Sequence, residues 1–235
     1  MQPTIVLVHG AFAENASWNG VIDALTATGH RALAASNPLR GVSTDAAAVS
    51  DVIRAIDGPV VLVGHSYAGA VITNVDADNV VSLVYVNAFA PEPGETCFEL
   101  SSLYPGSTLG ETLEPTPRGD GTTELTIARE RFRAQFCADV PAADAALMAA
   151  TQRPVTREAL LEPSGDRPRW KELPSWFVIG ELDCNIPAAA QHFMAERAGS
   201  QRTIELEGAS HAVAVSRPHG VADLILEAAA AGVGV

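Results

Sequence analysis

The chain has 235 residues, which suits a single domain with a sizeable core, or a core domain that carries an insertion. Apolar residues make up 47% of the chain and charged residues 18%, as in ordinary globular proteins. The formal net charge of −13 argues against binding to nucleic acid or to anionic membrane surfaces, and no block of Lys or Arg forms a local exception.

The N-terminal sequence and the cysteines bear on the cellular setting. The opening MQPTIVLVHG has no charged region and too short an apolar run for a signal peptide, and no stretch of the chain is long enough to span a membrane. We therefore expect a cytoplasmic protein. The cysteines Cys97, Cys137 and Cys184 are far apart and form no C-x-x-C pair, so neither a zinc site nor a disulfide framework is predicted.

The first 87 residues alternate between short apolar runs and helical patterns. The run Val60–Val63 is continuously apolar, as expected for a strand that is buried on both faces of a parallel sheet. Asp45 stands where a helix cap is expected. The predicted elements, strand and helix in turn, are Thr4–Val8, Ser17–Thr28, Arg31–Ala35, Asp45–Ile56, Val60–Val63, Ala68–Val75 and the strand Val80–Val86.

The alternation stops after Asn87 and resumes near residue 172. The segment between, residues 88–171, is predicted to be a cap inserted over the sheet, with a hairpin of Leu113–Thr116 and Glu124–Ile127 and helices over Ala128–Phe136 and Ala142–Thr151. The remaining elements are expected at Trp176–Ile179, from about Pro187, at Thr203–Leu206 and at Val221–Ala229, followed by a frayed apolar tail. Residues 1–87 and 172–235 then form an α/β core whose mostly parallel sheet of about six strands has helices on both faces.

The sharpest motif is Gly64-His65-Ser66-Tyr67-Ala68-Gly69, which lies between a buried strand and a helix. This is the setting of the nucleophile elbow G-x-S-x-G, a tight turn that lifts a serine hydroxyl above the sheet. The second glycine of the pattern is replaced by Ala68, and a glycine follows one residue later. A serine hydroxyl is a weak nucleophile and needs a base.

Two further groups follow later strands in the order Ser, acid, His that accompanies such an elbow. Asp183 comes directly after the strand Trp176–Ile179, and His211 directly after Thr203–Leu206. The carboxyl ends of parallel strands share one edge of a sheet, so we predict a catalytic triad of Ser66, His211 and Asp183 there. Glu181 is the nearest rival to Asp183. Asn87 also ends a strand, but an amide cannot supply the negative charge.

The loop after the first strand, Val8-His9-Gly10-Ala11-Phe12, is predicted to complete the site. The backbone N–H groups of Ala11 and Tyr67 are the expected oxyanion hole, with Phe12 as the fallback for Ala11. The aromatic residues Phe12, Phe89 and Phe98 are candidate walls of the substrate pocket. His9 and His65 are expected to hold loops by hydrogen bonds. No metal motif and no G-x-G-x-x-G is present, so no cofactor is predicted.

These features together resemble the plant methylesterase and hydroxynitrile lyase branch of the α/β-hydrolases. The resemblance rests on TIVLVHGAF with Trp18 and Ala27-Thr-Gly-His30, on Phe136–Asp144 with Arg153-Pro154, and on Gly208-Ala-Ser-His211. It implies an α/β-hydrolase fold under a cap, small and largely apolar substrates, and a possible homodimer. Lyase members carry Thr where this chain has Gly10, and Lys where it has Ala212, so the resemblance points to the esterase side.

The sequence therefore predicts a cofactor-free serine carboxylesterase that cleaves small ester substrates through an acyl-enzyme. Two alternatives stay open. The same scaffold could run lyase or cofactor-free oxygenase chemistry, because a fold does not fix a reaction. A ligand receptor could keep the triad while it has lost turnover.

Overall fold

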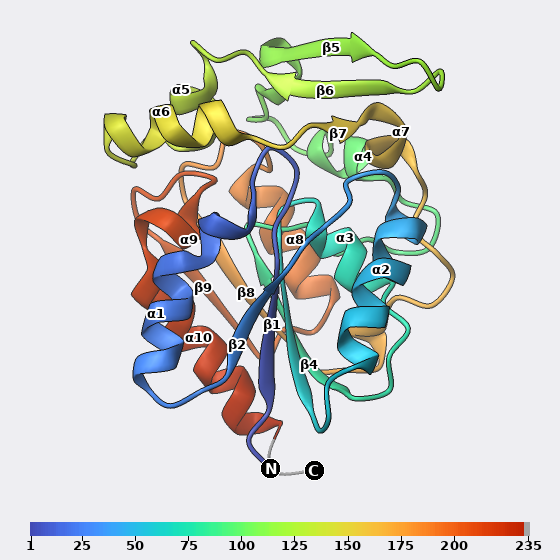
Figure 1. Cartoon of the computed structure of the whole chain (residues 1–235), viewed down its shortest axis with the longest axis vertical. Helices are drawn as coiled ribbons and strands as arrows, with labels where there is room; N and C mark the ends of the chain where they lie inside the picture. The colour runs from blue at the N-terminus through green and yellow to red at the C-terminus, as the bar shows by residue number, and fades with distance from the viewer. Residues whose placement is uncertain (233–235) are drawn as a thin grey trace.

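The computed structural model describes residues 1–232, and its centre is a six-stranded sheet in which all neighbouring strands run parallel (Figure 1). The strand order is β2-β1-β3-β4-β8-β9. This confirms the α/β class and the number of strands predicted from the alternating pattern. The strands are β1 (Thr4–Val8), β2 (Ala32–Ala35), β3 (Val60–His65), β4 (Val80–Val86), β8 (Ser175–Gly180) and β9 (Arg202–Leu206).

Helices cover both faces of this sheet, which explains why the central strands read as continuous apolar runs. In β1, Ile5 and Leu7 pack into one buried cluster, and Val6 and Val8 pack into the other. The first cluster lies under α1 (Asn19–Ala27), α9 (Val213–Ser216) and α10 (Pro218–Ala231), and α1 follows the short helix η1 (Asn15–Trp18). The second lies under α2 (Val42–Arg54), α3 (Ala68–Thr73) and α8 (Ala188–Arg197).

Two helix ends differ from the sequence prediction. The helix α2 begins at Val42 after Gly41, so Asp45 lies within its first turn and does not cap it. Its buried carboxylate instead accepts hydrogen bonds from the Tyr67 hydroxyl (2.8 Å) and the Arg40 backbone N–H (3.1 Å). The last helix continues to Ala231, because its apolar face packs on the sheet where a frayed tail was expected. Residues 233–235 of that tail lie outside the described residues.

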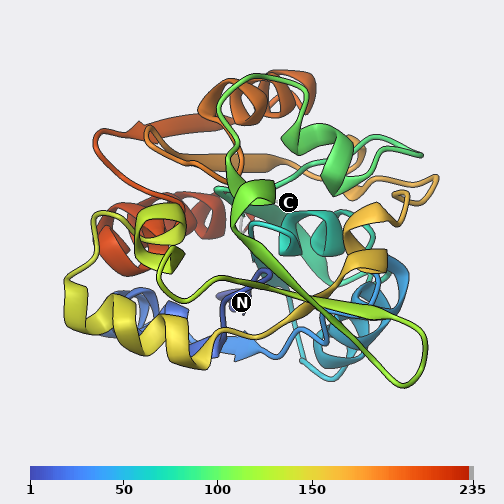
Figure 2. The ribbon, with the colours of Figure 1, turned by 90° about the horizontal axis from the view of Figure 1, so that it is seen from above.

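Residues 97–161 lie across the carboxyl ends of the strands, at the opposite end of the molecule from the N-terminus (Figures 1 and 2). We call this segment the cap. The predicted insertion extended to residue 171, but its last residues run down the side of the core, where Arg169 Nη2 donates to the Ala77 carbonyl just before β4 (3.3 Å). The predicted hairpin is present as β5 and β6, and a two-residue strand, β7, extends it to a three-stranded sheet. The cap elements are α4 (Cys97–Ser101), η2 (Leu109–Thr112), β5 (Leu113–Pro117), β6 (Thr123–Ile127), α5 (Phe132–Phe136), α6 (Ala142–Thr151), β7 (Val155–Thr156) and α7 (Arg157–Leu161), and the short helix η3 (Arg169–Lys171) follows beside the core.

The helix predicted over Ala128–Phe136 is shorter than expected. Ala128 donates its N–H to the Thr112 carbonyl, which keeps it in line with the hairpin, and α5 begins only at Phe132. None of the helices within residues 1–232 is long and apolar enough to cross a bilayer.

Candidate active site

Ser66 occupies a tight turn between β3 and α3. Its φ of +57° is in the left-handed region, which a serine rarely adopts and which costs about 1–3 kcal/mol. The turn is held from both sides, since Ser66 N–H donates to the Val86 carbonyl (3.2 Å) and Gly69 N–H donates to the Ser66 carbonyl (2.9 Å). The strand direction and this turn bring the hydroxyl to the carboxyl edge of the sheet, under the cap.

The departure from the G-x-S-x-G pattern at Ala68 has a structural reason. The position that tolerates no side chain here is Gly69, because a Cβ on it would lie 2.2 Å from the Phe89 carbonyl oxygen. Ala68 is fully buried and its methyl group fits the apolar cluster on that face. The glycine requirement has therefore moved by one residue along the helix.

The structure brings the three predicted side chains, Ser66, His211 and Asp183, into hydrogen-bond contact. His211 Nε2 lies 2.9 Å from Ser66 Oγ, and His211 Nδ1 lies 2.7 Å from Asp183 Oδ2. All three residues are buried. Because Nδ1 faces a carboxylate it carries the proton, which leaves Nε2 as the acceptor for the serine hydroxyl.

Several hydrogen bonds fix the position of the Asp183 carboxylate. Its Oδ1 accepts the backbone N–H groups of Asn185 (2.8 Å) and Ile186 (3.0 Å), and its Oδ2 also accepts from the Gln191 side chain (2.9 Å). These donors satisfy a buried carboxylate and fix its rotamer. The sequence analysis missed Gln191, because nothing in a helix pattern shows which residue turns toward a loop.

The two rivals for the acid have other roles. Glu181 is exposed, and its carboxylate accepts the Gly208 backbone N–H at the entrance to the histidine loop (2.8 Å). Asn87 is fully buried, with φ of +45°, and its amide joins three segments. Its Nδ2 donates to the carbonyls of Ser210 (3.0 Å) and His211 (3.1 Å), and its Oδ1 accepts the Gly180 N–H (2.6 Å).

His65 supports the same loop from the side of the nucleophile. Its Nε2 donates to the His211 carbonyl at 3.0 Å, and the two imidazole centroids are 4.7 Å apart. Burial, and then the neighbouring His211, hold the pKa of His65 well below its usual value. A neutral ring at this position keeps its donor on the carbonyl and places no second positive charge beside His211.

The residues predicted to supply the oxyanion donors line the same cavity as the serine. Ala11 and Tyr67 both line the cavity that contains Ser66, and within residues 1–232 neither backbone N–H donates to another backbone oxygen. The fallback donor was wrong, because the Phe12 N–H is engaged by the Arg153 carbonyl of the cap (3.1 Å).

His9 braces this loop, as the sequence suggested. Its Nδ1 donates to the Gly10 carbonyl (2.9 Å), and its Nε2 accepts from the Asn37 N–H (3.2 Å) and faces Arg153 Nη1 at 3.1 Å. Burial lowers the pKa of His9 to about 4, so the ring is neutral near pH 7 and can accept these donors.

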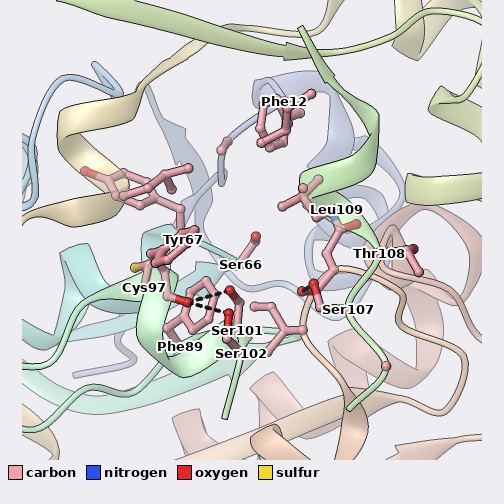
Figure 3. Close-up of a pocket in the computed structure, with 18 of the residues that line it drawn as sticks. Phe12, Ser66, Tyr67, Phe89, Cys97, Ser101, Ser102, Ser107, Thr108 and Leu109 are labelled. Carbon is pink, nitrogen blue, oxygen red and sulfur yellow. Dashed lines mark hydrogen bonds between the residues drawn. The ribbon is translucent and has the colours of Figure 1, made fainter. Parts of the chain in front are cut away.

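A cavity of about 470 Å³ opens above Ser66 (Figure 3). Figure 3 shows the Ser66 hydroxyl within the ring of lining residues, with Phe12 on one side and Ser101 and Ser102 on the other. All three predicted aromatic residues line it: Phe12 and Phe89 are buried, and Phe98 is 59% exposed at its rim. The other lining residues include Cys97, Tyr104, Ser107, Thr108, Leu109, Glu111, Leu113, Leu160 and Ile186.

The cap is hydrogen-bonded to each loop that carries a functional group. Besides the Phe12 contact, the Phe136 carbonyl accepts the Ala212 N–H after the histidine (2.9 Å). Gln135 Nε2 donates to the Cys184 carbonyl (2.9 Å) beside the acid, and Ser210 Oγ is bonded to Asp139. Sequence patterns could not indicate these contacts, because the residues that make them are far apart in the chain.

The residues described, 1–232, contain no group of three or more His, Cys, Asp and Glu side chains placed to hold a metal ion. The site contains a hydroxyl, an imidazole and a carboxylate joined by hydrogen bonds at the edge of a cavity. On a parallel sheet with an elbow at this position, that arrangement is typical of the α/β-hydrolase class. A family model agrees, matching residues 5–224, and the chain belongs to the alpha/beta hydrolase family.

Curated relatives extend this result. The chain is 27% identical to a pyrethroid hydrolase from Sphingobium wenxiniae, over 95% of this chain and 86% of that protein. It is 25% identical to methylesterase 8 of Arabidopsis thaliana, over 96% of this chain and 89% of the relative. The crystal structure of polyneuridine aldehyde esterase superposes with a TM-score of 0.81 at 18% identity, covering 97% of this chain and 99% of that one. These likenesses confirm the resemblance drawn from the sequence.

Proposed function

We propose that this protein is a serine carboxylesterase that hydrolyses small, largely apolar esters through an acyl-enzyme. The observation that carries the proposal is the position of His211, which bonds Ser66 Oγ through Nε2 (2.9 Å) and Asp183 Oδ2 through Nδ1 (2.7 Å). An imidazole held in this tautomer can remove the serine proton as the hydroxyl attacks a carbonyl.

The reaction proceeds in two halves. In the first, Ser66 Oγ bonds to the ester carbonyl carbon while His211 takes its proton, and the negative charge on the carbonyl oxygen is stabilised by the N–H groups of Ala11 and Tyr67. His211 then gives its proton to the leaving alcohol as the C–O bond breaks. In the second half, water loses a proton to His211 as it attacks the acyl carbon, and His211 then returns this proton to Ser66 Oγ as the bond between Oγ and the acyl carbon breaks, which releases the acid and the free serine. Asp183 stabilises the imidazolium in both halves.

The volume and the lining of the cavity favour small esters as substrates. Its volume of about 470 Å³ is within the range of sites for small organic ligands, and its walls are mainly apolar and aromatic. The names of the relatives, a pyrethroid hydrolase and a methylesterase, are in keeping with ester cleavage. Burial raises the pKa of the Cys97 thiol in the wall, so this cysteine is a neutral lining group and is not a second nucleophile.

The lyase alternative is disfavoured by the space around two positions. A Cβ on Gly10 would lie 2.6 Å from both the His65 carbonyl oxygen and Ser66 Cβ, so the threonine of the lyases does not fit this loop as it stands. Ala212, where lyases carry a lysine, is 3% exposed and supplies no cation.

The decisive experiment combines covalent labelling with turnover. A fluorophosphonate probe should label Ser66, as located by mass spectrometry, and p-nitrophenyl acetate should be hydrolysed at a steady rate. Ser66→Ala and Asp183→Asn should each lower kcat by about 10³-fold or more, because the nucleophile is lost in one and the tautomer is wrong in the other. The matched control is Ser43→Ala, which removes an exposed hydroxyl outside the cavity and should leave the hydrolysis intact.

Two outcomes would overturn the proposal. Labelling at another residue, with unchanged turnover in Ser66→Ala, would exclude this nucleophile. A ligand that raises the melting temperature of the wild type, without any hydrolysis of an ester panel, would instead identify a receptor.

A further inference from the structure

The cavity above Ser66 has an unusual charge balance. Within the described part of the chain, the residues that line it include no Lys, Arg or His, and Glu111 is the one acidic side chain among them. Glu111 takes part in no ion pair within residues 1–232, so its negative charge is not neutralised by a neighbour. The Glu111 carboxylate therefore attracts positively charged ligands in the cavity and repels negatively charged ones.

The segment that carries Glu111 is fixed in position. Glu111 lies in η2, where its backbone N–H donates to the Thr108 carbonyl (3.1 Å). The Thr108 N–H in turn donates to the Cys184 carbonyl beside the catalytic acid (3.0 Å), and the Thr112 hydroxyl closes the turn on the Leu109 carbonyl (2.8 Å). The carboxylate is therefore attached to a part of the cap that is tied to the core.

The hydroxyl groups of the wall add to the same polarity. Ser101 and Ser102 both donate their protons to the Phe98 carbonyl, as the dashed lines in Figure 3 show. Ser107 donates to the Asn185 carbonyl and Thr108 donates to the Gln135 side chain. With these protons engaged, the four hydroxyls offer a ligand their lone pairs, which attract cations and N–H groups and repel carboxylates.

The N–H groups of the oxyanion hole do not offset this polarity. They lie beside Ser66, where the carbonyl oxygen of an ester occupies them during the reaction. The wall elsewhere contains Glu111 and the hydroxyl oxygens, with the Asn185 amide and the Tyr104 hydroxyl as neutral donors, so a negative group on the substrate would meet a carboxylate and no cationic side chain. The net charge of −13 adds a long-range repulsion of the same sign.

We infer that this site selects esters by charge, accepting neutral and cationic esters and rejecting those that carry a carboxylate, with Glu111 as the residue that sets the preference. The inference rests on the proposed esterase function and names the substrate class of that same site. Because Glu111 is exposed, water and salt screen its charge, and the expected discrimination is modest.

The test uses three acetate esters of matched size: 4-acetoxybenzoate, 4-acetoxybenzamide and 4-acetoxybenzamidinium. Each kcat/KM is divided by the rate of the same ester with hydroxide, which removes differences in intrinsic reactivity. At low ionic strength the wild type should favour the cation over the anion by roughly tenfold, and 0.5 M NaCl should reduce this ratio. Glu111→Gln should lower the ratio by about threefold or more, and Glu111→Lys should lower it further.

The matched control is Glu114→Gln. Glu114 is also exposed and lies three residues further on, in β5, but it does not line the cavity. It changes the net charge by the same amount and should leave the ratio at the wild-type value. Both Glu111 variants replace an exposed side chain, so we expect them to fold.

The outcomes separate this inference from the function on which it rests. Hydrolysis of the neutral amide that depends on Ser66, with equal rates for the cation and the anion, would refute the charge selection alone. If the ratio falls equally in Glu111→Gln and Glu114→Gln, the charge preference comes from the net charge of the protein, which would refute the role of Glu111. No hydrolysis of any of the three esters would remove the proposed function, and the selection with it.

Discussion

Replacement of Asn87 by alanine tests whether the amide that joins β4, β8 and the histidine loop positions His211, the proposed catalytic base. The substitution removes both donors to the loop, which now bond the carbonyls of Ser210 and His211, and the acceptor for the Gly180 N–H. The His211 carbonyl keeps its bond from His65, so the loop is loosened but not released.

The magnitude follows from the groups left without a partner. The Gly180 N–H and the Ser210 carbonyl each lose their buried hydrogen bond to Asn87. Each loss lowers the free energy of unfolding by about 1–2 kcal/mol. Alanine in the left-handed region at φ of +45° adds about 1 kcal/mol, which Asn87→Gly avoids. We expect the free energy of unfolding to fall by about 3–5 kcal/mol in Asn87→Ala and by about 1 kcal/mol less in Asn87→Gly.

The effect on catalysis should fall on kcat. A displacement of His211 by a fraction of an ångström to 1 Å lengthens the bond to Ser66, which lowers the rate by about 10–100-fold. The Michaelis constant should change by less than about threefold, because Asn87 does not line the substrate cavity and removes no substrate contact. Steady-state kinetics with p-nitrophenyl acetate, and urea unfolding followed by circular dichroism, measure the two effects.

Asn79 provides a matched control at the other end of the same strand. Its amide also donates to backbone carbonyls, those of Ile53 (3.1 Å), Ile56 (3.1 Å) and Gly58 (3.3 Å). It lies eight residues before Asn87, about 26 Å away along an extended strand. Asn79→Ala should lower stability and leave kcat unchanged. Equal losses of kcat in the two alanine variants, or a kcat within twofold of wild type in Asn87→Ala, would refute the positioning role.

Two further predictions concern stability. Gly69→Ala should destabilise the fold by about 3 kcal/mol or more in urea unfolding, because the new Cβ meets the Phe89 carbonyl at 2.2 Å. Gly119→Ala, with nothing within 4 Å of a new Cβ, should change little, and equal effects would refute the steric argument. His9, with a folded pKa of about 4 against 6.5 in the unfolded chain, takes up its proton on unfolding, so stability falls as the pH drops below about 6.5. Between pH 7.5 and 5 this contributes a loss of about 2 kcal/mol, which His9→Gln should abolish and the exposed His219→Gln should not.

The sequence predicted the sheet and the order of the functional groups because both depend on local patterns. The run Val60–Val63 is continuously apolar, as expected for a strand covered on both faces, and Asp183 and His211 each follow a predicted strand directly. Since carboxyl ends of parallel strands meet at one edge, three positions in the correct order were enough to expect that Ser66, Asp183 and His211 would meet.

The contacts that orient these groups could not be predicted in the same way. Asp45 was expected to cap its helix, but the tertiary contact with the Tyr67 hydroxyl draws its carboxylate inward. Phe12 was a plausible oxyanion donor until the cap placed the Arg153 carbonyl on its N–H. Asn87 was noted only as a position lacking a negative charge, and its three hydrogen bonds depend on segments that come together at β8 and the histidine loop.

The bonds between the cap and the core loops bear on how this enzyme scaffold could be re-engineered. Transplanting the cap of a relative to acquire a new specificity would also remove the partners of Phe12, Cys184 and Ala212. Such a chimera would lose rate even if its pocket were well shaped. Chimeras that keep Gln135, Phe136 and the Arg153 carbonyl, and vary only residues 97–113, should acquire a new substrate specificity with a smaller loss of turnover.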